Sequence, residues 1–165
     1  MEEVVHFDRR RREFLKTAGT TAAFGALAAA NLAWPGTALA QGAWNAKAFS
    51  SKSLSDVVKA YGGAGAEPTN DVSWGSTPEI AENGAVVPIS VTSRIPNTES
   101  ISILIEKNPN ALAARFQFPQ GTDPTVSTRV KINQSSNVHA LIKTANGKFY
   151  VATREVKVTI GGCGG

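Results

Sequence analysis

Cysteine and histidine are scarce in this sequence. Its 165 residues include one cysteine, Cys163, and two histidines, His6 and His139. A single cysteine excludes a disulfide bond within the chain. One cysteine and two histidines also make none of the usual zinc-binding patterns, so we expect neither a metal site nor a cofactor of the protein's own.

A large charge of one sign is lacking as well. The formal net charge is +4, and residues 41–165 hold twelve basic and nine acidic residues, a net charge of +3. This charge is too small and too diffuse to indicate a nucleic-acid partner. Hydrophobic residues make up 42% of the chain and charged residues 18%, which is typical of a globular domain and excludes wholesale disorder.

The usual groups of an active site are also missing. The acidic residues are scattered through turns and strand faces, and His139 lies between Val138 and Ala140 in an alternating pattern. We expect His139 to be a surface or half-buried strand residue. A nucleophilic pair of Cys163 with His139 requires fixed geometry, which a glycine-rich tail does not provide. We therefore predict that the protein is not an enzyme.

Residues 1–40 have the pattern of a cleavable targeting segment. A basic stretch leads into a twin-arginine export motif, formed by Arg11, Arg12, Phe14, Leu15 and Lys16. Residues 17–33 are rich in alanine, glycine and threonine, too weakly hydrophobic for a convincing membrane span. The alternatives are a retained membrane anchor and an accidental basic amphipathic stretch.

Ala38 and Ala40 fit the small-x-small rule for cleavage, which gives a mature protein that starts at Gln41. A twin-arginine signal implies transport in the folded state to the periplasm. It also permits a partner without a signal of its own to be carried along.

One short helix is predicted over residues 53–61. Ser53 is a plausible N-cap and Asp56 follows three residues later, as in a weak capping box. One apolar stripe with helical spacing follows, and Gly62-Gly63 ends the helix; the stripe consists of Leu54, Val57, Val58 and Tyr61.

After Asp71 the apolar residues alternate with polar ones, which is the period of β-strands. Alternation indicates strands near residues 72–74, 85–92, 100–106, 115–118, 126–132, 138–142, 148–153 and 155–160. We expect residues 64–70 to be a loop and residues 78–84 to be a connector. Pro88 suggests an edge position or a bulge, and Asn146-Gly147 a tight hairpin.

About six to eight short strands with no second helix predict an all-β fold, an antiparallel β-sandwich of immunoglobulin-like type. We expect three parts: the signal peptide 1–40, the sandwich domain 41–160 and a flexible C-terminal arm 161–165.

The arm carries the chemistry. Cys163 is flanked by the glycines Gly161, Gly162, Gly164 and Gly165. Glycines add no side chains, so the arm could enter a narrow channel, but ordering it is costly in entropy. No basic residue in the arm favours the thiolate, so we expect a partner's active site to activate the thiol. A chance cysteine is the plain alternative, yet an exposed thiol is a liability in an oxidising compartment.

These features resemble the SoxY family, the sulfur-carrier subunits of the bacterial thiosulfate-oxidising (Sox) system. The resemblance rests on the twin-arginine signal, the single helix, residues 80–88 and 106–109, and above all the terminal Gly-Gly-Cys-Gly-Gly.

Several partners are implied by this resemblance. A SoxZ-type subunit without its own signal would form a heterodimer with the protein and be co-exported. A haem cytochrome, SoxXA, would join thiosulfate oxidatively to Cys163 as a cysteine S-thiosulfonate. A dimanganese hydrolase, SoxB, would release sulfate, and a sulfur dehydrogenase, SoxCD, would oxidise the remaining persulfide sulfur where that enzyme is present.

Two other functions fit the residues. The first is an exported immunoglobulin-like binding or structural module that uses Cys163 for an intermolecular disulfide. The second is a thiol enzyme, which would turn over without a partner.

Overall fold

The computed structural model describes residues 45–160 of the chain. The predicted signal peptide, its cleavage site and the predicted arm with Cys163 lie outside the described residues. The domain boundaries predicted at residues 40 and 160 therefore stay predictions. The described residues belong to one compact unit.

Two short helices precede the strands. α3 (Leu54–Ala60) has Ser53 as its N-cap, whose Oγ accepts a hydrogen bond from the Asp56 amide at 3.2 Å. Gly62 follows with a φ of +84°, a left-handed conformation that suits glycine. The predicted helix is thus confirmed. α2 (Ala46–Phe49), capped by Asn45, was not expected because its four residues are too few to show a helical period.

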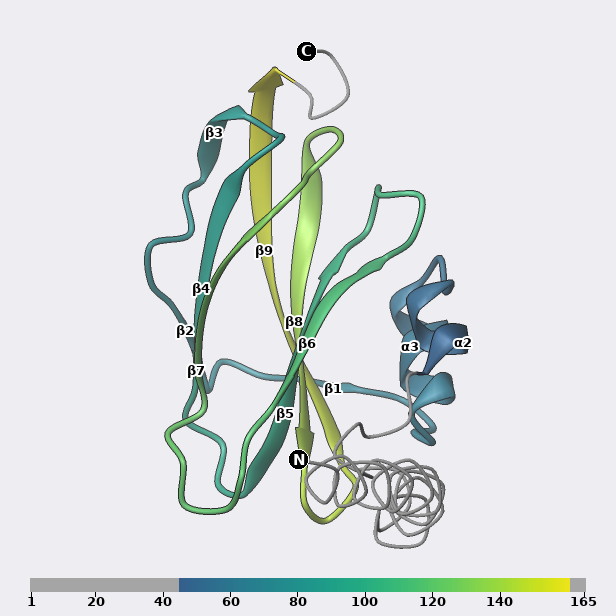
Figure 1. The fold of residues 1–165 in the computed structure, drawn as a ribbon. Coiled ribbons are helices and arrows are strands. Elements are labelled where there is room, and N and C mark those ends of the chain that lie inside the picture. The colour runs from purple at the N-terminus through teal and green to yellow at the C-terminus, as the bar shows by residue number, and fades with distance from the viewer. Residues whose placement is uncertain (1–44, 161–165) are drawn as a thin grey trace, which may run out of the picture. The chain divides into compact units, whose positions relative to one another are not determined.

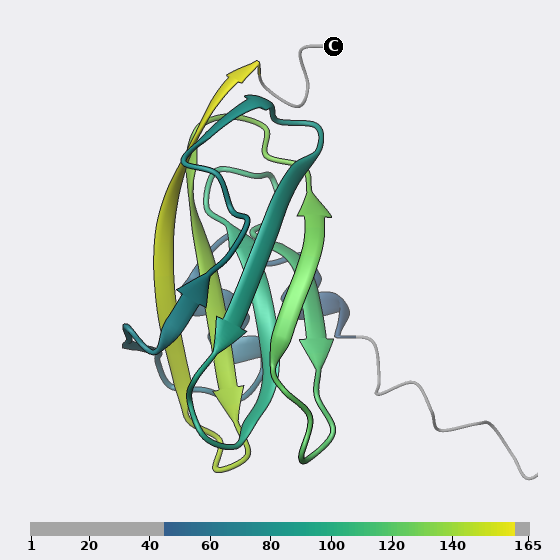
Figure 2. The ribbon, with the colours of Figure 1, turned by 90° about the vertical axis from the view of Figure 1, so that its left-hand side faces the viewer.

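The strands form two sheets, as predicted for a β-sandwich (Figures 1 and 2). The strands are β1 (Glu67–Pro68), β2 (Val72–Trp74), β3 (Ile80–Asn83), β4 (Val87–Ser93), β5 (Thr98–Ile105), β6 (Leu112–Gln117), β7 (Thr125–Val130), β8 (Ser136–Thr144) and β9 (Phe149–Ile160). The larger sheet has the order β1-β9-β8-β5-β6, with β3 also paired to β9, and the smaller sheet has the order β2-β4-β7. Figure 2 looks onto the smaller sheet.

The main core lies between the two sheets. Its side chains come from the apolar positions that alternate along the strands, which the sequence had marked as one face. They are fully buried in β4, β5 and β8: Val87, Ile89, Val91, Ile101, Ile103, Ile105, Val138, Ala140 and Ile142.

A second apolar cluster lies on the other face of the larger sheet. Val57 and Val58 of α3 pack there against Leu104, Leu141 and Phe149. Figure 1 shows the helices beside this sheet, away from the smaller one. Leu104 is therefore buried under the helices, while its neighbours Ile103 and Ile105 are buried in the main core. Simple alternation would leave Leu104 exposed.

Three expectations about strands need correction. Residues 78–84 are not a plain connector, because β3 forms there and pairs in parallel with β9, Ile80 with Lys157 and Ala81 with Val158. The two strands predicted at 148–153 and 155–160 are one strand, β9. The loop predicted at 64–70 contains β1, which also pairs in parallel with β9. Parallel partners far apart in sequence leave no local signal.

Pro88 fits the predicted edge position. β2 pairs with β4 only from Val91 to Ser93, so at Pro88 the strand has β7 as its paired neighbour. A proline cannot donate a ladder hydrogen bond and is tolerated on such an open side.

Candidate functional site at the end of strand β9

The candidate site is the place where β9 ends. Cys163 and the four glycines lie outside the described residues, but Ile160 is the last residue of β9, three residues before Cys163. Three extended residues span at most about 11 Å. The position of Ile160 therefore limits where the thiol can act.

Backbone hydrogen bonds hold the end of β9 against β3. The Gly84 amide donates to the Ile160 carbonyl at 2.8 Å, and the Lys157 amide donates to the Glu79 carbonyl at 2.8 Å. The hydroxyl of Thr159 donates to the Glu82 carbonyl, also at 2.8 Å.

The loop before β8 holds the opposite edge. The Val158 amide donates to the Ser135 hydroxyl at 2.9 Å. On the β3 side, the Gly84 carbonyl in turn accepts from the Ile132 amide at 2.7 Å. With neighbours on both edges, Ile160 is a fixed attachment point for the residues that follow.

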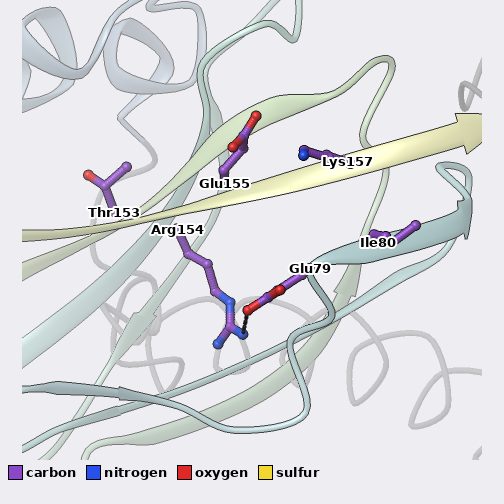
Figure 3. A pocket seen from close by; sticks show the side chains of 6 residues that line it. All are labelled: Glu79, Ile80, Thr153, Arg154, Glu155 and Lys157. Carbon is purple, nitrogen blue, oxygen red and sulfur yellow. Dashed lines mark ion pairs between the residues drawn. The ribbon is translucent and has the colours of Figure 1, made fainter.

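A shallow hollow of about 420 Å³ lies beside this end of β9 (Figure 3). Arg154 and Glu79 form an ion pair across it, with 3.6 Å between guanidinium and carboxylate. The Glu79 side chain is 82% exposed, so the pair adds little to stability. Glu155 and Lys157 project from the other side of β9. The hollow is thus a polar, mixed-charge surface.

His139 lies on β8, further from the end of β9. Its Nδ1 is 2.9 Å from the Thr153 hydroxyl, and its Nε2 is 3.9 Å from the Glu106 carboxylate. Burial lowers the pKa of His139, and the negative charge of Glu106 opposes that shift only in part. The expected half-buried strand position is confirmed.

The length of β9 between Thr153 and Ile160 argues against a nucleophilic pair of Cys163 with His139 within one chain. Thr153, the cross-strand partner of His139, lies seven residues before Ile160, about 23 Å along a strand. Cys163 would have to turn back along β9, and three extended residues cover less than half of that distance, about 11 Å. This separation supports the prediction that His139 is not the general base for Cys163.

Within residues 45–160, no three side chains of the metal-binding types lie close enough together to hold a metal ion. In the same range, no helix is long and apolar enough to span a membrane.

Sequence reasoning missed Ile80 and Val86 beside the end of β9. The two residues are 62% and 57% exposed. Nothing in the local pattern distinguishes them from core residues, because Val86 adjoins the buried Val87 and Ile80 adjoins the buried Ala81.

Comparison with known proteins identifies the family. The family model for the sulfur oxidation protein SoxY matches residues 58–163 of the sequence. This range is more than half of the chain and includes Cys163. Among solved structures, the sulfur carrier protein SoxY from Chlorobium limicola f thiosulfatophilum is 35% identical with a TM-score of 0.56. The match covers 63% of this chain and 93% of that one.

A superoxide reductase (neelaredoxin) from Ignicoccus hospitalis is also similar, with 21% identity and a TM-score of 0.47 over 55% of this chain and 81% of that one. A similarity of this size carries no argument about function. No curated protein matched the sequence. The extent of the family match shows that the chain belongs to the SoxY family of sulfur oxidation proteins.

Proposed function

We propose that the protein is a periplasmic carrier that holds the intermediates of thiosulfate oxidation covalently on Cys163. One observation carries the proposal: in a chain of the SoxY family, the single cysteine follows three residues after a strand end that is anchored on both edges. The similarity to a sulfur carrier protein supports the same role.

Loading of the carrier is an oxidation. The thiolate of Cys163 and the outer sulfur of thiosulfate form an S–S bond, which gives a cysteine S-thiosulfonate. Two electrons leave in this step, and the proton of the thiol is released. A haem cytochrome of the SoxXA type accepts the electrons.

Unloading is a hydrolysis. Water attacks the sulfonate sulfur, the S–S bond next to it breaks, and sulfate leaves together with one proton. A persulfide stays on Cys163 for a SoxCD-type dehydrogenase. The hydrolysis itself belongs to a SoxB-type enzyme.

The carrier presents the bound intermediate to the enzymes and does not catalyse their reactions. His139 does not reach Cys163 within one chain, and the glycines around the thiol offer no activating cation. Ordering the glycines costs entropy, so each visit to a partner is weak and short, which suits a carrier that serves several enzymes in turn. Gly161, Gly162, Gly164 and Gly165 form the carrier arm in this proposal.

Export follows from the N-terminal segment in the same proposal. Residues 1–40 direct the folded protein through the twin-arginine route, and cleavage after Ala40 removes them. A SoxZ-type subunit without a signal travels with the protein as its heterodimer partner.

The test is the mass of the protein purified from cells grown on thiosulfate. We expect intact-mass peaks for thiosulfonate and persulfide adducts that disappear on reduction, and their absence in Cys163→Ser. Growth on thiosulfate that survives Cys163→Ser would refute the proposal. A stoichiometric disulfide partner on non-reducing gels would instead favour the structural module.

A relocated thiol is the matched control. Ser127 is exposed on strand β7, which pairs with β4, and the double variant Ser127→Cys with Cys163→Ser keeps one accessible cysteine per chain. We expect this variant to react with alkylating reagents but to carry no adduct in cells, because its thiol cannot enter a partner's channel.

A further inference from the structure

Among residues 45–160, the exposed large hydrophobic residues gather at one end of the sandwich. Among residues 45–160, the large hydrophobic side chains that are exposed are Ile80 at 62%, Val86 at 57% and Ile160 at 58%. Isolated exposed apolar residues are normal on a protein surface, so their number alone means little. Their positions carry the argument.

All three residues surround the place where β9 ends. Ile160 is the last residue of β9, and its carbonyl accepts from Gly84, two residues before Val86. Ile80 lies on β3, opposite Lys157 of β9. Figure 1 shows the end of β9 beside β3, at the end of the sandwich opposite the β8–β9 hairpin. We call Ile80, Val86 and Ile160 the apolar collar.

The collar residues belong to neither of the two apolar clusters. Their neighbours in sequence fill the core, since Ala81 and Val87 are buried there. The collar residues themselves are exposed, and exposed apolar residues that gather at one place on a surface are typical of an interaction site.

The reach of the thiol explains what covers the collar. Cys163 lies within about 11 Å of Ile160 even when the intervening residues are fully extended. A partner that reacts with the thiol inside a channel must therefore bring the mouth of that channel close to the end of β9. Residues around Ile160 are then buried at each visit.

We propose that the apolar collar is the docking surface for the channel mouth of the enzymes that act on Cys163, and that this mouth is bordered by apolar side chains. The inference rests on the proposed carrier function. The mixed-charge hollow of Glu79, Arg154 and Lys157 lies directly beside Ile80 and supplies the polar rim that surrounds an apolar interface centre.

The test uses the complete mature heterodimer and a SoxB-type hydrolase. Tetrathionate loads the thiol without any enzyme: the thiolate displaces thiosulfate and keeps the S-thiosulfonate, so the collar plays no part in loading. Sulfate release is then measured against carrier concentration. The test variant combines Ile80→Ser, Val86→Ser and Ile160→Ser, and each single variant is also measured.

The control variant replaces three exposed apolar residues away from the collar: Ala113→Ser, Pro119→Ser and Ala145→Ser. We expect the collar variant to raise KM for the loaded carrier about 10-fold or more, because central apolar contacts dominate interfaces of this kind. Values of kcat, the thermal midpoint and the alkylation rate of Cys163 should stay close to the parent's, as should KM for the control.

An unchanged KM for the collar variant overturns the inference while leaving the carrier function intact. Loss of the SoxZ-type subunit from the purified variant would overturn it too, by assigning the collar to the subunit interface. A change from dimer to monomer of the chain alone would assign it to self-association. If the hydrolase releases no sulfate from the loaded protein without collar substitutions, the result contradicts the carrier function itself and with it the collar proposal.

Discussion

The two ends of β9 are held in different ways. At its start, the side chain of Phe149 is buried against α3 in the second apolar cluster. At its end, hydrogen bonds hold the strand, and the side chain of Ile160 is exposed. Side-chain packing therefore stabilises the fold at one end, while hydrogen bonds hold the other end and leave the side chain of Ile160 exposed.

Removing the Phe149 side chain should have the largest effect. Phe149→Ala leaves a cavity beneath the helices, so we expect a loss of about 3–5 kcal/mol in the free energy of unfolding. Ile160→Ala, at the other end of the same strand, should cost less than about 0.5 kcal/mol. Urea unfolding of both variants measures the contrast, and equal losses would contradict it.

Adding a methyl group at Gly63 should have the next largest effect. A Cβ there would lie 2.7 Å from the Phe149 ring and from a methyl group of Val58. We expect Gly63→Ala to cost about 1–3 kcal/mol through overpacking. Gly65→Ala is the matched control, because a Cβ at that position meets nothing within 4 Å. A thermal midpoint that falls equally in both variants would argue against the packing at Phe149.

Ser135 tests the hydrogen bonding at the C-terminal end of β9. Ser135→Ala removes the acceptor for the Val158 amide, which should cost about 1 kcal/mol and speed hydrogen exchange at Val158. Ser127→Ala, on an exposed strand position, is the control. Unchanged exchange at Val158 would show that Ser135 does not fix the end of β9.

The pH dependence of stability should give the smallest effect. Burial puts the pKa of folded His139 below its ordinary value of 6.5, so the unfolded chain binds the proton more readily. Stability is then fully present above 6.5 and decreases as the pH falls below it. Urea midpoints across this range measure the slope, and His139→Gln should remove the contribution. If stability depends on pH equally steeply in His139→Gln, the pH dependence belongs to other titratable groups.

Local patterns predicted what local interactions decide. The cap at Ser53 and the alternation of Val87, Ile89 and Val91 are properties of neighbouring residues, so the sequence was sufficient for α3 and β4. Parallel pairing of β3 with β9 was missed, because its partners are about eighty residues apart (Ile80 with Lys157) and neither segment signals the other.

Exposure could not be predicted in the same way. Val86 and Val87 have the same side chain and adjacent positions, yet the first is exposed and the second is buried, since the sheet decides which one faces the core. The glycine neighbours of Cys163 are what single it out in the sequence, and its role as the attachment site stays a prediction. The collar became visible only when the strands that surround the end of β9 were placed together.

The place of β9 in the larger sheet has a consequence for biosynthesis. β9 is synthesised after every other described strand, yet it lies inside the sheet, between β1 and β8. The sheet therefore stays divided until residues 149–160 have emerged, and pairing of β1 and β3 must wait for them. A chain that ended before Phe149 would lack β9, and both β1 and β3 would then lose the strand with which they pair.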